Sequence, residues 1–378
     1  MPEERRYEIN QEINQDISQD INQDMNQEIE QKGMDEAGNR PGIGESNPVK
    51  AGRRFFSKIG FIFLAGSLAI ACVQALAIKL VYRFFPQWME STTGVLLVTM
   101  LVMYLLAMPL MVFIISRLKS KVAISQHRMT LGQWILAAFM SYGITYGANL
   151  IGTALTVLIG LVKGSAVENV LVTMISGSNL WVVFLFMVLC APVFEEFIFR
   201  KLLVDRVVVY GEGVAVVLSG LIFGLFHGNL SQFSYAFFIG IFFAFIYVKT
   251  GRIRYTIALH MAINFVGSVL PIWIMKLSHY DEFMEALTLV QTNMAEGMAR
   301  LQAVMPGVLL FAGYALVIFG TAITGIILLL VHRKKFKLMP GQKVIPKGKR
   351  FATVIVNAGM ILFCVYWIAQ IIVQLIIG

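Results

Sequence analysis

The sequence predicts an all-α fold: a polytopic integral membrane helical bundle of about nine transmembrane helices that follows a disordered N-terminal tail. The composition is the first reason. The chain of 378 residues is 57% hydrophobic and only 14% charged, whereas an ordinary soluble domain is nearer 25% charged. This composition excludes a soluble single core, a disordered chain and a collagen-like fibre.

Long uncharged runs are the second reason. A bilayer-spanning helix needs ~20 consecutive apolar residues, and in hydrocarbon the backbone must satisfy its own hydrogen bonds, which favours helices. The run 213–248 is long enough for two spans, with a break at the polar step 229–232. The runs without Asp, Glu, Lys or Arg are residues 59–78, 91–116, 129–162, 169–194, 213–248, 255–275, 307–331 and 351–378.

The basic residues gather between the runs, in every second connection. By the positive-inside rule the side that carries them is the cytoplasm. The sequence therefore predicts a multi-pass protein of the cell membrane with a cytoplasmic N-terminus. Nucleic-acid binding is the weaker explanation of the net charge of +9, because the basic residues flank spans and form no single face.

Four regions are predicted along the chain. Residues 1–54 form a low-complexity cytoplasmic tail and linker, in which residues 9–32 repeat every four residues with Asn and Gln dominant. Residues 55–177 hold N-terminal transmembrane helices, and 178–275 a transmembrane core that contains the candidate site described below. The end, 276–378, contains an amphipathic interfacial segment at 279–304 and two further spans. No signal peptide is visible, because the first apolar run begins some 58 residues into the chain.

The acidic residues locate the chemistry. Only ten carboxylates lie beyond residue 54, and two of them, Glu195 and Glu196, are adjacent in an apolar stretch. Ionisable side chains at membrane depth are costly and usually functional. Glu196 and Arg200 are four residues apart on one helix face, in the favourable order for an ion pair. The Glu195 side chain points ~100° away from that face, so Arg200 does not neutralise it. Glu195 is therefore the candidate general base. A kink at Pro192 would aim its side chain into the helix bundle.

Two histidine motifs follow on successive apolar helices. His227 lies four residues after Phe223, and His260 lies four residues before Asn264. The second spacing puts His260 and Asn264 on one helix face. Each residue alone has a structural explanation, such as packing or an interhelical hydrogen bond. Together with the two glutamates they form a polar cluster that a membrane bundle does not need for stability.

The motifs EExxxR, FxxxH and HxxxN, in this order on successive transmembrane helices, resemble the CPBP family. These are the CAAX-processing and bacteriocin-processing intramembrane proteases, also called Abi proteins. The resemblance covers about residues 178–275. It implies an endopeptidase in which Glu195 and His227 activate a water, while His260 and Asn264 stabilise the oxyanion. Glu196, Arg200 and Phe223 would have supporting roles.

The family has also been described as metal-dependent. A catalytic zinc site needs three protein ligands, and Glu195, His227 and His260 would supply them. No HExxH helix is present. We therefore expect a metal-free mechanism that uses Glu195 and His227. No cofactor is certain, and zinc is the alternative.

The expected partners are the lipid bilayer and a membrane-associated peptide or protein, either of the CAAX type or a leader or bacteriocin-type peptide. Two other functions stay open: a proton-coupled membrane transporter, because buried Glu and His also relay protons, and a catalytically silent membrane scaffold. One spacing is awkward. With its fifth span starting near Glu212, the sequence places His227 farther outward than Glu195, unless that span begins later or is tilted.

Overall fold

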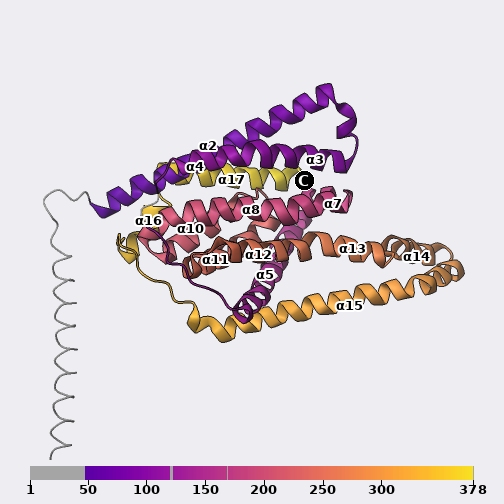
Figure 1. Cartoon of the computed structure of the whole chain (residues 1–378). Helices are drawn as coiled ribbons and strands as arrows, with labels where there is room; N and C mark the ends of the chain where they lie inside the picture. The colour runs from indigo at the N-terminus through magenta and orange to yellow at the C-terminus, as the bar shows by residue number, and fades with distance from the viewer. Residues whose placement is uncertain (1–46, 120–121, 168, 378) are drawn as a thin grey trace, which may run out of the picture. The chain divides into compact units, whose positions relative to one another are not determined.

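The computed structural model describes residues 47–119, 122–167 and 169–377, and every regular element in this part of the chain is a helix. The multi-pass all-α prediction is confirmed. The predicted tail lies almost entirely outside the described residues, and its four-residue repeat does so completely. Eight helices are long and apolar enough to cross a membrane: Pro48–Phe84 (α2), Thr92–Ser116 (α3 to α4), Leu131–Lys163 (α5), Leu180–Tyr210 (α7 to α9), Leu230–Thr250 (α11), Ile253–Leu277 (α12 to α13), Met294–Lys335 (α15 and the turn after it) and Ala358–Ile377 (α17) (Figure 1).

The fifth of the nine expected spans is shorter than a full crossing. Its helix, α10 (Glu212–Leu225), has 14 residues, which corresponds to about 21 Å at 1.5 Å per residue. The hydrocarbon core is about 30 Å thick. The uncharged run in this region continues through a turn into α11, and hydropathy alone does not reveal where the first helix ends.

The fourth span also differs from its predicted bounds of 169–194. A short helix, α6 (Val170–Ser176), comes first, and the spanning helix then runs from Leu180 to Tyr210. The charged residues 195–200 were expected to end the span. They do not end it, because Glu196 and Arg200 are fully buried against neighbouring helices and not exposed to lipid.

This long helix is not uniformly α-helical. A short α-helix, α8 (Ala191–Glu196), lies between two π-helical segments, Phe184–Cys190 and Phe197–Val204. A third π-helical segment, Phe265–Val269, follows α12 (Ile253–Asn264). Such wide turns occur often at functional sites, since they change the direction in which the following side chains point.

Helix α10 packs closely along α11, antiparallel to it. A Cβ atom at Gly220 would lie 2.8 Å from the carbonyl oxygen of Phe237, so only glycine permits this approach. Where α10 begins and α11 ends, Lys249 Nζ forms an ion pair of 2.5 Å with Glu212. Figure 1 shows α5 crossing the other helices steeply, and α5 packs on α11, α12 and α15.

The expected interfacial segment 279–304 is divided between two helices. Its first half is α14 (Tyr280–Thr292), and its second half forms the beginning of α15 (Met294–His332). Asn293 separates them and caps α15 by accepting a hydrogen bond from the backbone N–H of Glu296. The division into regions 55–177, 178–275 and 276–378 stays a prediction.

Candidate active site

The two adjacent glutamates face different surroundings, as their helical positions predict. Glu196 is completely buried, whereas the Glu195 side chain is 18% exposed. Arg200 Nε lies 3.1 Å from Glu196 Oε2, which confirms the predicted ion pair. Glu195 forms no described ion pair with a cation of its own helix. Its Oε2 lies 3.7 Å from Nε2 of His260, which comes from α12.

His260 lies between the two carboxylates. Its Nδ1 is 2.9 Å from Glu196 Oε1 and its Nε2 faces Glu195. Glu196 is a carboxylate, because it pairs with the Arg200 guanidinium. A carboxylate only accepts hydrogen bonds, so His260 Nδ1 donates this one. Two carboxylates are therefore balanced by the Arg200 guanidinium and, when His260 is doubly protonated, by an imidazolium.

Arg200 is fully buried, and two aromatic rings lie beside its guanidinium. Its guanidinium carbon lies 4.5 Å from the centre of the Phe223 ring and 5.7 Å from that of Phe243. Its two terminal nitrogens have no hydrogen-bond partner. Cation–π contact of this kind is strongest where water is excluded, so the rings offset part of the cost of burying the charge.

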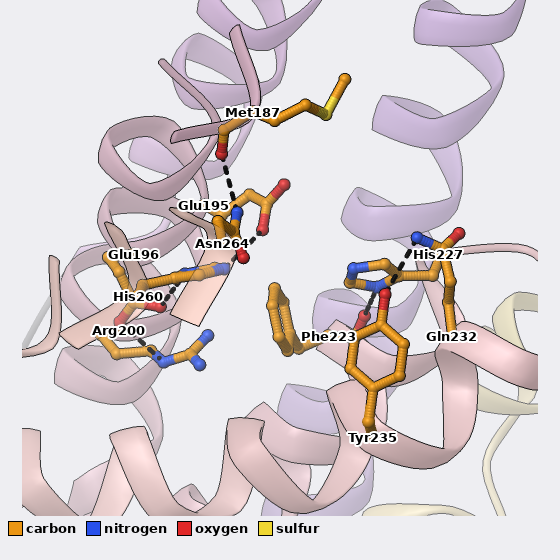
Figure 2. Close-up of polar contacts among 10 residues, drawn as sticks. All are labelled: Met187, Glu195, Glu196, Arg200, Phe223, His227, Gln232, Tyr235, His260 and Asn264. Carbon is orange, nitrogen blue, oxygen red and sulfur yellow. Dashed lines mark hydrogen bonds and ion pairs between the residues drawn. The ribbon is translucent and has the colours of Figure 1, made fainter. Parts of the chain in front are cut away.

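The predicted pair His260 and Asn264 does lie on one face of α12 and reaches the same site (Figure 2). Asn264 Nδ2 donates a hydrogen bond of 2.8 Å to the backbone carbonyl of Met187. That carbonyl is available for a local reason. Ala191 N–H bonds to Phe186 O, five residues back; the next donor in this π-helical pattern would be Pro192, which has no N–H.

Pro192 therefore has a second effect beyond the expected kink: it leaves the Met187 carbonyl free to hold Asn264. Asn264 keeps one Nδ2 hydrogen and its Oδ1 for other partners. The Met187 carbonyl was missed by sequence reasoning. The signal that could have found it is the proline five residues later, read together with a π-helical turn that the sequence does not reveal.

His227 lies in the turn after α10, on the other side of Phe223 from His260. The Phe223 ring centre is 4.9 Å from His227 and 5.8 Å from His260, with nearly perpendicular rings in both cases. Figure 2 shows the Glu195 carboxylate on the side that faces His227. His227 Nδ1 is 2.8 Å from the Phe223 carbonyl oxygen. Since a carbonyl only accepts, Nδ1 carries the proton and Nε2 keeps its lone pair.

Three further polar side chains lie beside His227, and sequence reasoning missed all of them. Gln232 Nε2 donates a hydrogen bond of 3.1 Å to the Tyr235 hydroxyl, and the Tyr235 ring centre is 6.4 Å from that of His227. Asn229, which caps α11, donates to the His227 carbonyl. The polar step 229–232 was interpreted only as a break between spans, because nothing in its spacing connects it to the motifs.

The structure removes the difficulty over depth. Glu195 lies 15 residues from each end of the helix Leu180–Tyr210, so it is at mid-length and not near the inner end. His227 lies 15 residues after Glu212, where α10 begins. Glu195 and His227 thus lie equally many residues from the connection between these two helices, and no later start of α10 is needed to explain the spacing. The error came from ending the fourth span at Phe194.

The three side chains considered for zinc do not converge. Within the described residues no group of three His, Cys, Asp or Glu is placed to hold a metal ion. His260 directs Nδ1 to Glu196, His227 directs Nδ1 to its own helix, and the Phe223 ring lies between the two imidazoles. The described arrangement of Glu195, His227 and His260 therefore does not fit a three-ligand metal centre.

A carboxylate, two imidazoles and an amide thus gather at mid-length in apolar helices, and side chains of these types can carry out acid–base chemistry. Residues 177–266 match the family model described as type II CAAX prenyl endopeptidase Rce1-like. This region of the chain is therefore similar to the CPBP/CAAX family of intramembrane proteases, and the match supports CAAX-type protease activity in general. All seven motif residues, from Glu195 to Asn264, lie inside the match. A search of the curated proteins and a search of the solved structures each gave no match.

Proposed function

We propose that this protein is an intramembrane endopeptidase that hydrolyses a peptide bond with a water activated by Glu195 and His227. The observation that carries the proposal is the asymmetry of the two glutamates. Glu196 is neutralised by Arg200 and His260, while Glu195 faces the side where His227 offers an unprotonated Nε2. One carboxylate is thus kept as a support and the other is left for proton transfer.

In the proposed reaction, a water between Glu195 and His227 gives up a proton to Glu195, while His227 Nε2 accepts its second hydrogen bond. The water oxygen attacks the carbonyl carbon of the substrate, and the carbonyl oxygen becomes an oxyanion. The free Nδ2 hydrogen of Asn264 donates to it, as does Nε2–H of His260 when that ring is doubly protonated. Glu195 then returns the proton to the leaving amine, so that one peptide and one water become an acid and an amine.

The proposed substrate is a membrane-associated peptide or protein, of the CAAX type or of the leader or bacteriocin type. The test uses the full chain reconstituted in liposomes. It is offered a farnesylated CaaX peptide, the same peptide without the lipid, and a leader peptide, with cleavage followed by mass spectrometry. Cleavage of at least one peptide is expected. Proton-coupled flux without any cleavage would instead favour a transporter, and rescue of a cellular phenotype by Glu195→Gln would favour a scaffold.

A metal-free mechanism predicts that chelators leave the activity in place. The reconstituted protein is dialysed against EDTA, its metal content is measured, and cleavage is assayed before and after addition of Zn²⁺. We expect less than a twofold change at each step, because the proposed water is activated by Glu195 and His227 alone. A metal-dependent enzyme loses activity with its metal and regains it with zinc, and that result would contradict the Glu–His mechanism.

Tyr235 is expected to assist the reaction. Because Gln232 donates to its hydroxyl oxygen, the phenolic proton is free to donate to the substrate near His227. Tyr235→Phe removes one neutral hydrogen bond, worth about 0.5–1.5 kcal/mol, so kcat/KM should fall roughly three- to tenfold. Tyr366→Phe on α17 is the matched control, since that residue touches no motif side chain in the described contacts. Equal activity of both variants would exclude the role of Tyr235.

A further inference from the structure

A groove at the beginning of α2 combines cations and apolar side chains in one surface. It has a volume of about 570 Å³ and lies between α2, the end of α4 (Met108–Ser116) and the residues that precede α17. It is remote from the candidate active site, because none of the motif residues lines it. Ser57 Oγ accepts the backbone N–H of Gly359 and so joins α2 to α17 at the edge of the groove.

The residues that α2 contributes form two rows with a spacing of four. One row is Arg53, Ser57, Phe61 and Ala65; the other is Arg54, Lys58 and Ile62. Such rows run nearly along the helix axis on one face. The polarity therefore changes along the helix and not around it. The charged side chains lie at positions 53–58 and the apolar ones at positions 61–65. From position 53 to position 65 the helix rises about 18 Å.

The three cations of the groove are exposed and have no ion-pair partner among the described residues. None of the residues that line the groove is acidic. Arg54 and Lys58 are four residues apart, where like charges repel each other on a helix. Asn357, also in the lining, already bonds to the Thr353 and Val354 carbonyls. Among the described residues, no side chain therefore supplies an anion to the charged end of the groove.

The other end of the groove is hydrocarbon. Phe61, Ile62 and Ala65 of α2 and Ile114 of α4 line it. A soluble phosphate would use only the cations, and an acidic peptide would leave this apolar wall unpaired. A molecule with an anionic head and a hydrocarbon chain matches both ends, and the span of about 18 Å accommodates a headgroup and the first part of an acyl chain.

We propose that this groove is a binding site for an anionic phospholipid, with the phosphate held by Arg53, Arg54 and Lys58 and one acyl chain against the apolar wall. Basic pockets between transmembrane helices bind anionic headgroups by this chemistry. The inference is independent of the proposed hydrolysis, because it uses no residue of the candidate active site. It gives the beginning of α2 a role that its apolar run alone does not explain.

The test compares lipid retention by the full chain. The protein is extracted from vesicles of phosphatidylglycerol and phosphatidylcholine, and the lipids bound per protein are measured by native mass spectrometry. The variant Arg53→Gln/Arg54→Gln/Lys58→Gln should reduce the preference for phosphatidylglycerol roughly 10- to 100-fold. The reason is that each of the three cations contributes a similar share of the binding free energy of an anionic headgroup. The matched control is Lys334→Gln/Lys335→Gln/Lys337→Gln, which removes the same charge from exposed positions outside the groove.

A second variant separates a lipid site from an anion site. Ala65→Trp keeps all three cations and fills the apolar wall, so phosphatidylglycerol retention should fall while the net charge is unchanged. Size-exclusion chromatography and thermal unfolding confirm that each variant is folded. The proposal is overturned if the control triple variant loses as much preference as the groove variant. It is also overturned if Ala65→Trp retains phosphatidylglycerol normally, or if soluble glycerol phosphate displaces the lipid at millimolar concentration.

Discussion

Replacing Glu195 by glutamine is expected to lower kcat/KM for peptide cleavage by about 10²–10⁴-fold, the range that general acid–base catalysis contributes. Glutamine keeps the size of the side chain and its hydrogen-bonding reach, but it neither accepts the proton of the attacking water nor returns it to the leaving amine. The surroundings of Glu195 make this loss specific: among the described ion pairs, its carboxylate contacts only Nε2 of His260.

The measurement is cleavage by reconstituted protein at substrate concentrations below KM. Glu90→Gln is the matched control, because Glu90 is exposed, far along the chain from the motifs and free of described ion pairs. The control should retain wild-type activity. His227→Ala should approach the loss seen for Glu195→Gln, since both residues act on the same water. If Glu195→Gln and His227→Ala both leave cleavage unchanged, the assignment of the site is wrong.

Replacing Arg200 by methionine is expected to lower the free energy of unfolding by about 3–5 kcal/mol, the cost of leaving one partner of a buried ion pair uncompensated. Both side chains of the pair with Glu196 are completely buried. Methionine retains much of the packing against Phe223 and Phe243 but leaves the Glu196 charge with His260 alone. The free energy is measured by denaturant unfolding of the full chain in detergent micelles.

The chain contains a matched control for this experiment. Arg300 and Glu296 form an ion pair with the same spacing of four residues, but their side chains are 56% and 49% exposed. Arg300→Met should cost well under about 1 kcal/mol, as exposed ion pairs contribute little. The double variant Glu196→Gln/Arg200→Met should lose less than the two single losses added, because it removes both charges. Equal small losses for Arg200→Met and Arg300→Met would show that the buried pair does not stabilise the fold.

Much of the membrane architecture was predictable from the sequence. The uncharged runs located all eight long helices, because the bilayer requires ~20 apolar residues wherever a helix crosses. The fifth expected span became the short helix α10, and the fourth extended past its predicted end at Phe194 to Tyr210. Both errors have one cause: hydropathy treats each residue by itself, whereas neighbouring helices decide whether a charge such as Arg200 is buried or exposed.

The candidate site divides in the same way. The spacing of four residues placed Glu196 with Arg200 and His260 with Asn264 on shared helix faces, because helical geometry is local. Contacts between helices were not predictable. His260 between the two glutamates, Phe223 between the two histidines and Tyr235 beside His227 all join segments far apart in the chain.

The sequence by itself therefore determined the class of fold, the adjacent glutamates as the place to look, and the pairing within each helix. Only the tertiary structure decided which carboxylate is neutralised from a second helix, which carbonyl holds Asn264 and why three candidate zinc ligands do not meet. The physical reason is that periodicity along one helix fixes direction but not partners. Partners depend on how helices pack, and here that packing follows from close approaches such as Gly220 against Phe237 and from the wide turns on either side of Glu195.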